Sequence, residues 1–151
     1  MILKEDVKSI AKEMIAFMRS DLGYTHKRDP IVYFADAERY GTCSGGMRND
    51  KKPFIFIARG HFCKHGTHLE YDHIQEDPDI GGFTGASSKK CINAIVAHEL
   101  AHVLSYTVKK VKIGKSFNGY MSTNKDDMLH HGIKWQYFYS ILRKKFVNHL
   151  S

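Results

Sequence analysis

The motif HExxH occurs once in the chain, at residues 98–102, inside an apolar run that extends from residue 91 to residue 108. On an α-helix, residues four positions apart lie on the same face, so His98 and His102 can bind one metal ion. The carboxylate of Glu99 then faces a water molecule on that ion. This is a minimal arrangement for making a nucleophile of water at neutral pH, and it predicts a catalytic zinc site. The alternative is a helix that carries these three residues by chance.

The residues around the motif favour the zinc site over chance. Apolar side chains recur at helical spacing and indicate a buried helix: Ile92, Ile95, Val96, Leu100, Val103 and Leu104. Ser87 and Ser88 are suitable N-cap residues just before it. Ionisable groups in the middle of a buried helix cost solvation free energy unless they are paired or bound to a metal.

A catalytic zinc ion needs a third protein ligand. No glutamate follows His102, which excludes the zinc enzymes that take a glutamate from a later helix. The pattern HExxHxxGxxH is excluded as well, because Ser105 and Val108 replace its glycine and its third histidine. The remaining candidates lie near the C-terminus: Asp126, Asp127, His130, His131 and His149.

His131 is the preferred third ligand because it begins the apolar face of the last expected helix. That face continues at steps of three or four residues through Trp135, Phe138, Leu142 and Phe146. His130 begins a more polar series and remains the alternative ligand, since the phase of a helix is only loosely fixed by sequence. Asp126 and Asp127 are better suited to the negatively charged first turn of this helix.

Taken together, the two histidine motifs resemble the SprT-like metallopeptidase domain of the SprT and Spartan family. The first is HELAH at residues 98–102 and the second is HGxxW at residues 131–135. Weaker similarity extends upstream, to the glycine-cysteine turn at residues 40–43 and to the strand at residues 53–57. The resemblance covers about residues 31–146, but the segment from 102 to 131 and the loop from 59 to 88 are longer than is typical of the family.

This resemblance implies an α+β, zincin-like fold in a single domain, residues 1–151. A small antiparallel or mixed sheet would pack against an N-terminal helix, the HExxH helix and a C-terminal helix. The activity implied is that of a zinc-dependent endopeptidase, with one catalytic Zn²⁺ bound by His98, His102 and His131. Glu99 would be the general base, and Tyr106, Tyr120 and Tyr137 are candidates for stabilising the transition state. The resemblance also points to substrates that are associated with nucleic acid.

The overall charge of the chain agrees with a polyanionic partner. The formal net charge is +7 and the pI is about 9.3, and an excess of lysine and arginine attracts phosphates. DNA or RNA contact is expected first at the lysine-rich segment 109–117 and at residues 143–145. Segment 109–117 has two interpretations, a short basic hairpin or a solvated connector, and the connector is favoured.

Two features predict a cytoplasmic protein without a membrane partner. Cys43, Cys63 and Cys91 are an odd number of widely spaced cysteines without a CxxC pair, which favours reduced thiols. Charged residues interrupt the apolar residues of the N-terminus, so it does not resemble a signal peptide, and no later run is long enough to span a membrane.

The first half of the chain predicts a helix and then strands. Residues 3–22 form an amphipathic pattern that Gly23 ends, with a membrane-surface helix as the less favoured alternative. Residues 31–35 predict a strand, and a turn at 48–52 suggests a hairpin. The strand at 54–58 is expected to be the sheet edge beside the active site, where an extended peptide could pair with it.

The loop at residues 59–88 is rich in possible metal ligands. A second, structural zinc ion could use residues from the set His61, Cys63, His65, His68, His73 and Cys43. Their spacing matches no standard zinc finger, so a flexible lid or rim over the active site is favoured.

Two other functions remain open for the chain as a whole. One is a nucleic-acid- or protein-binding module in which the zinc ion is purely structural. The other is zinc-dependent hydrolysis of a bond that is not a peptide bond.

Overall fold

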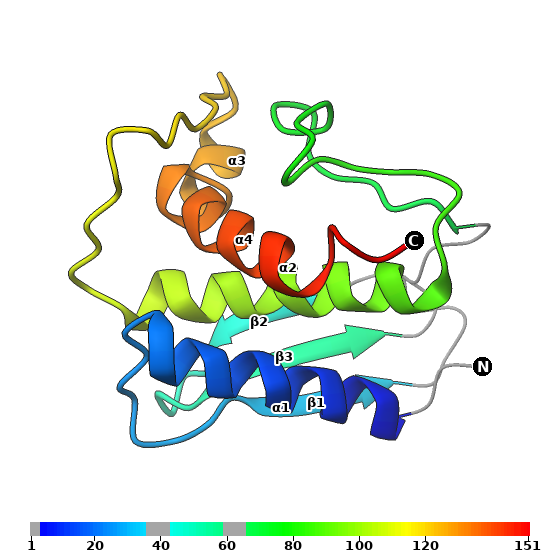
Figure 1. Ribbon diagram of the computed structural model, residues 1–151. Coiled ribbons are helices and arrows are strands. Elements are labelled where there is room, and N and C mark those ends of the chain that lie inside the picture. The colour runs from blue at the N-terminus through cyan, green and yellow to red at the C-terminus, as the bar shows by residue number, and fades with distance from the viewer. Residues whose placement is uncertain (1–3, 36–42, 59–65) are drawn as a thin grey trace.

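The computed structural model describes residues 4–35, 43–58 and 66–151 (Figure 1). These residues form four helices, α1 (Lys4–Asp21), α2 (Ser88–Thr107), α3 (Lys125–His130) and α4 (Ile133–Phe146). They also form three strands, β1 (Ile31–Ala35), β2 (Ser44–Met47) and β3 (Pro53–Ala58). The α+β class is therefore confirmed, with a mixed sheet of three strands.

The strand order is β1-β3-β2, with β1 parallel and β2 antiparallel to β3. The predicted hairpin is confirmed, because β2 and β3 pair across the turn at residues 48–52. The prediction that residues 54–58 form the sheet edge is wrong, because β3 is the middle strand. Ile55 and Ile57 are fully buried, and β1 and β2 pair with the backbone of β3 on its two sides. The edges are instead β1 and β2, and β2, whose sequence is SGGM, is the edge strand that packs closely against α2.

Helix α2 lies at the centre of the molecule. It packs against β2, β3 and α1 on one side and against α4 on the other, so that it lies between the sheet and α4 (Figure 1). The six apolar residues that predicted a buried helix are all buried. The predicted N-cap is also confirmed, because the Ser87 side chain accepts a hydrogen bond from the Lys90 backbone N–H at 3.2 Å. A helix in this position carries its polar side chains into the interior.

Helix α1 uses its apolar face for core packing, as the favoured interpretation predicted. Val7, Met14 and Met18 are fully buried, and Gly23 follows the helix with a φ of +72°. Leu3 lies outside the described residues. Within those residues, no helix has the length and apolar character that crossing a membrane requires.

The segment between α2 and α3, residues 108–124, contains neither helix nor strand. The basic hairpin is therefore absent, and the favoured interpretation of a connector is confirmed. Val111 is partly buried against the core. Its four lysines, at positions 109, 110, 112 and 115, are exposed.

The cysteines depart from the prediction of reduced thiols. Cys43 is free, whereas Cys91, in the first turn of α2, is disulfide-bonded. Cys63 lies outside the described residues. A disulfide requires two Cβ atoms to lie about 4 Å apart, and spacing along the chain does not reveal that distance. Disulfides are typical of oxidising compartments, so Cys91 does not support the expected cytoplasmic location.

Candidate metal centre

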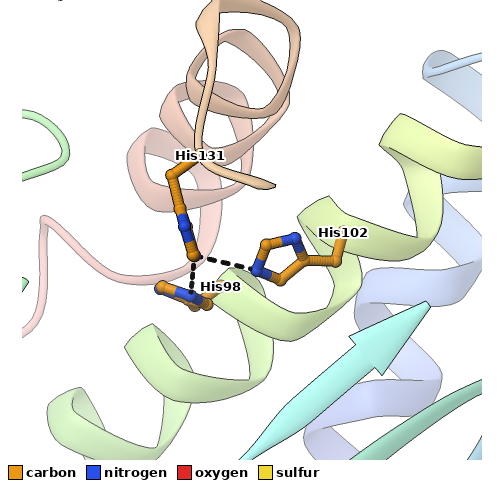
Figure 2. Close-up of side chains that lie close together, drawn as sticks. All are labelled: His98, His102 and His131. Carbon is orange, nitrogen blue, oxygen red and sulfur yellow. Dashed lines mark hydrogen bonds between the residues drawn. The ribbon is translucent and has the colours of Figure 1, made fainter. Parts of the chain in front are cut away.

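Three histidine side chains converge between α2 and the junction of α3 and α4 (Figure 2). The Nε2 atom of His131 lies 3.1 Å from Nε2 of His102 and 3.2 Å from Nε2 of His98. The possible ligand atoms of the three residues all lie within 4.8 Å of one another, close enough to bind one metal ion. His102 and His131 are 8% and 6% exposed. The sequence therefore predicted the members of this cluster correctly.

His131 reaches the cluster because the chain turns sharply between two helices. Helix α3 begins at the Asn124 cap and ends at His130, and the backbone N–H of His131 donates to the Asp127 carbonyl at 2.6 Å. A Cβ on Gly132 would lie only 2.6 Å from the Met128 carbonyl oxygen, so the turn requires glycine there. His130 remains exposed and outside the cluster.

The expected single C-terminal helix is therefore two helices. Asp126 and Asp127 occupy the first turn of α3, and α4 begins at Ile133 with Gly132 as its N-cap. The predicted apolar face of α4 is nevertheless confirmed, since Trp135, Phe138 and Leu142 are at most 2% exposed. The break between the helices follows from the glycine, which favours a turn over continued helix.

Trp135 joins the two histidine-bearing parts of the structure. Its Nε1–H donates to the carbonyl of His98 at 3.2 Å. Its ring lies 4.6 to 5.4 Å, centroid to centroid, from the rings of His98, His102 and His131. Because Trp135 is only 1% exposed, it forms an apolar wall behind the cluster and excludes water from that side.

Residues 68–75 close another side of the site. The ring of Tyr71 lies 3.8 Å from the ring of His131, centroid to centroid. The carbonyl of His131 accepts hydrogen bonds from Gln136 Nε2 at 3.0 Å and from His73 Nε2 at 3.2 Å. The described part of the histidine-rich loop thus forms a rim around the site, and its contacts fix the backbone of His131.

Glu70 is a residue of the site that the sequence did not reveal. Its side chain is 1% exposed, and its Oε1 atom accepts a hydrogen bond from His98 Nδ1 at 3.2 Å. Glu70 is one of several acidic residues between positions 70 and 79, and no spacing or helical face distinguishes it from Asp72 or Glu76. Only the tertiary contact with α2 identifies it.

Glu99 lies beside the three imidazoles with one unsatisfied oxygen. It is 5% exposed, its Oε2 has no hydrogen-bond partner among the described residues, and its Oε1 lies 3.9 Å from His98 Nε2. Strand β2 approaches closely here, because a Cβ on Gly45 would lie 2.4 Å from the Glu99 carbonyl oxygen. Burial raises the pKa of Glu99 to about 7; the His98 charge opposes the rise and the Glu70 charge adds to it.

The pKa values of the histidines suit metal binding. Burial, followed by the charge on His98, lowers the pKa of His102 to about 2 and that of His131 to about 3. Both imidazoles are therefore neutral near pH 7, which is the form that binds metal. Burial lowers the pKa of His98 too, but the Glu70 carboxylate outweighs burial and the net shift is upward. Burial likewise raises the pKa of Glu70, and His98 and His68 reverse that shift to a net decrease.

The three tyrosines proposed from the sequence lie elsewhere in the described structure. The Tyr120 hydroxyl donates to Asp77 at 2.5 Å, Tyr137 packs against Phe117, and Tyr106 lies beside Gly46. Tyr71, from the loop, is the tyrosine whose ring lies nearest to His131. Loop residues that reach a site by tertiary packing leave no periodic signal in the sequence.

The second zinc site, which was the less favoured interpretation of this loop, is not tested, because His61, Cys63 and His65 lie outside the described residues. The other members of that set have partners of another kind. His68 and His73 form hydrogen bonds with Glu70 and with the His131 carbonyl, and Cys43 Sγ accepts a bond from the Ala58 N–H at 3.3 Å. Within the described residues, the cluster of His98, His102 and His131 is the one group with metal-binding geometry.

No protein-family model, curated protein or solved structure matches this chain. The chemistry of the site follows from its own residues.

Proposed function

We propose that this protein is a zinc-dependent endopeptidase of the SprT-like, zincin-like type. One observation carries the proposal: three imidazole Nε2 atoms converge beside a buried glutamate, one of whose oxygens has no hydrogen-bond partner among the described residues. A structural zinc site is usually closed by four protein ligands, whereas catalytic sites use three. Within the described residues this cluster contains three.

The residues present fit a zinc ion. His98, His102 and His131 would hold it through Nε2, and the buried Oε2 of Glu99 has no hydrogen-bond partner within the part of the chain that the structure describes. When bound, zinc supplies a Lewis acid that activates water and polarises a carbonyl group.

Glu99 is the proposed general base. Its pKa of about 7 allows it to accept a proton from the attacking water and to return that proton to the leaving amine. The buried surroundings that raise this pKa also exclude bulk water, which strengthens electrostatic interactions during the reaction. Trp135 packs against all three histidine rings and Tyr71 packs against that of His131, so these contacts restrict the orientation of the proposed ligands.

The substrate would bind as an extended peptide along β2. This strand lies at the end of the sheet, against Glu99 on α2. Strand addition uses mainly backbone hydrogen bonds, so it predicts broad tolerance of side chains. The edge strand proposed for this role is β2, in place of the strand expected from the sequence.

Substrates associated with nucleic acid remain part of the proposal, and the exposed lysines of the connector support them. Residues 143–145 give weaker support to substrates associated with nucleic acid. Arg143 is 2% exposed and donates to the Gly81 carbonyl, Lys144 lies 3.5 Å from Asp79, and Lys145 lies over the ring of Phe17. Of the two expected contact regions, the connector is therefore the better candidate.

Replacement of Glu99 tests the proposal directly. The variant Glu99→Gln should bind about one zinc ion per chain but lose cleavage of casein and histones by about 100-fold or more, since it lacks the general base. Glu76→Gln, which changes an exposed glutamate, is the matched control and should retain activity. Equal cleavage by both variants would contradict the proposal. A zinc-loaded wild type that cleaves neither protein would favour the binding module or another hydrolase.

A further inference from the structure

Glu70 lies on the side of the His98 ring that is opposite to the histidine cluster. His98 directs Nε2 toward His131, at 3.2 Å, and Nδ1 toward Glu70 Oε1, also at 3.2 Å. The two nitrogens of one ring therefore face two different partners. The inferred role of Glu70 rests on the proposed metal site.

This arrangement selects one tautomer of His98. An ionised carboxylate only accepts hydrogen bonds, so His98 Nδ1 must carry the hydrogen that lies between it and Glu70. In the neutral ring, Nε2 then keeps its lone pair, directed at the position between the three histidines. Metal-binding histidines are commonly oriented by such a bond from the second nitrogen to a carboxylate.

Glu70 is itself held firmly in place. Its Oε1 accepts hydrogen bonds from His68 Nε2 at 2.7 Å and from the Tyr139 hydroxyl at 2.6 Å. The Tyr139 hydroxyl accepts a further bond from Arg143 Nη1 at 3.0 Å. Tyr139 and Arg143 belong to α4, and both are at most 2% exposed.

Burial of the Glu70 carboxylate costs desolvation free energy, and packing alone does not require a carboxylate at this position. Glu70 Oε2 has no partner among the described residues, although the backbone around Glu70 is anchored by an isolated bridge between His68 and Phe83 and by the hydrogen bond from the Glu70 N–H to Gln75 Oε1. An apolar residue would fill the same space without an unsatisfied oxygen. The hydrogen bond between Glu70 and His98 provides a reason for a carboxylate at this position.

We propose that Glu70 is the positioning residue of the metal site, which fixes the tautomer and the orientation of His98 so that Nε2 binds the ion. Tyr139 supports this role from α4. Glu70 would affect metal binding through the His98 ring and would not itself be a ligand.

Zinc affinity of the full chain, measured by competition with a chromophoric chelator, tests this role. Glu70→Gln keeps the shape of the side chain but removes its charge, and its amide can donate to Nδ1 and select the wrong tautomer. It should bind zinc about 10- to 100-fold more weakly than the wild type. The matched control Glu76→Gln removes the same charge from an exposed position in the same loop and should keep the wild-type affinity.

A spectroscopic measurement separates positioning from general loss of structure. In long-range ¹H–¹⁵N spectra of the zinc-loaded protein, His98 should be the tautomer protonated at Nδ1, with slow exchange of that hydrogen. Glu70→Gln should accelerate the exchange or change the tautomer. If Glu70→Gln does not fold, Tyr139→Phe provides the second test, with zinc affinity reduced about three- to tenfold.

The outcomes distinguish this inference from the proposed function. Unchanged zinc affinity in Glu70→Gln, or in Tyr139→Phe where Glu70→Gln does not fold, overturns the role of Glu70 and leaves the peptidase untouched. Reduced affinity supports the role even if casein and histones are not cleaved, in which case the peptidase proposal fails alone. A wild type that binds no zinc overturns both.

Discussion

Glu99 combines two properties at the scale of a single residue: near-complete burial, and one oxygen that no other described residue hydrogen-bonds. Burial raises the pKa of Glu99 to about 7, and the Oε2 atom is available to accept a proton. A carboxyl group whose pKa lies near neutrality is well matched to general base catalysis at neutral pH. The same burial makes its ionisation sensitive to any positive charge nearby.

The pH dependence of cleavage should reflect this pKa. Only ionised Glu99 accepts a proton, so kcat/KM should rise with pH and reach a plateau once Glu99 is ionised. Its pKa is about 7. A bound zinc cation favours the carboxylate, so the midpoint should lie at or below that value. Below the midpoint the rate should fall about tenfold per pH unit. A casein assay between pH 5 and pH 8 that gave a flat profile would rule out Glu99 as the base.

The choice between the adjacent histidines 130 and 131 makes a second prediction at this scale. His131→Ala removes a ring whose Nε2 lies 3.1 Å from that of His102, and zinc affinity should fall by more than about 100-fold. His130→Ala changes an exposed side chain one residue away and should leave affinity unchanged. Chelator competition measures both variants. Equal losses would mean that the metal site includes His130.

Some residues of the site could be predicted from sequence, and others could not. His98, Glu99 and His102 lie on one helix, where position along the chain determines position in space. His131 followed from the apolar residues after it, which placed it next to the core. Glu70 could not be predicted because its contact with His98 joins residues 28 positions apart through a loop without periodic structure.

At the scale of the elements, the site depends on the turn between α3 and α4. Gly132 permits this turn because the Met128 carbonyl lies where a side chain would begin. The turn directs His131 toward α2 and leaves His130 exposed. A continuous helix would have a fixed phase through both residues, and the sequence alone could not reveal that the phase is interrupted.

Substitution of this glycine should therefore affect both stability and metal binding. In Gly132→Ala the added Cβ would lie 2.6 Å from the Met128 carbonyl oxygen, so the two helices must move apart. We expect a loss of about 1–3 kcal/mol in the free energy of unfolding, together with weaker zinc binding. Urea unfolding and chelator competition measure these effects.

Gly114→Ala is the control for this substitution. In the connector, the nearest atom to an added Cβ lies 3.8 Å away, so stability and zinc affinity should be preserved. If Gly132→Ala matched this control in both measurements, the turn would not depend on glycine.

The strands show which part of the sheet was predictable. A hairpin joins neighbours in sequence, so the pairing of β2 with β3 followed from the turn signals between them. The parallel pairing of β1 with β3 joins more distant segments and has no local signal. Because the pairing of β1 with β3 was not predicted, the sequence placed β3 at the edge, whereas the structure places β3 between β1 and β2.

At the scale of the whole molecule, the buried histidines make the free energy of unfolding depend on pH. The folded-state pKa values of His102 and His131, about 2 and about 3, lie below the ordinary value of 6.5. The unfolded chain therefore binds more protons than the folded one between these values, and stability falls as pH falls. The contribution is fully present above pH 6.5 and is lost progressively toward about pH 3 for His131 and about pH 2 for His102.

Urea unfolding of chelator-treated protein at several pH values should show this dependence. The double variant His102→Gln with His131→Gln should lose less stability than the wild type between pH 6.5 and pH 4, since it lacks both groups. Glu99, with its raised pKa, has the opposite dependence but is present in both proteins, so the difference between them isolates the histidines. A wild type and a variant with the same pH dependence would contradict the assignment.

An ion held by His102 and His131 would also act as a cross-link between residues 29 positions apart. The connector, residues 108–124, lies inside the loop that this cross-link closes. The entropic cost of closing a loop grows only with the logarithm of its length. Lengthening the connector would therefore weaken metal binding little, which is consistent with the long interval between the two histidine motifs.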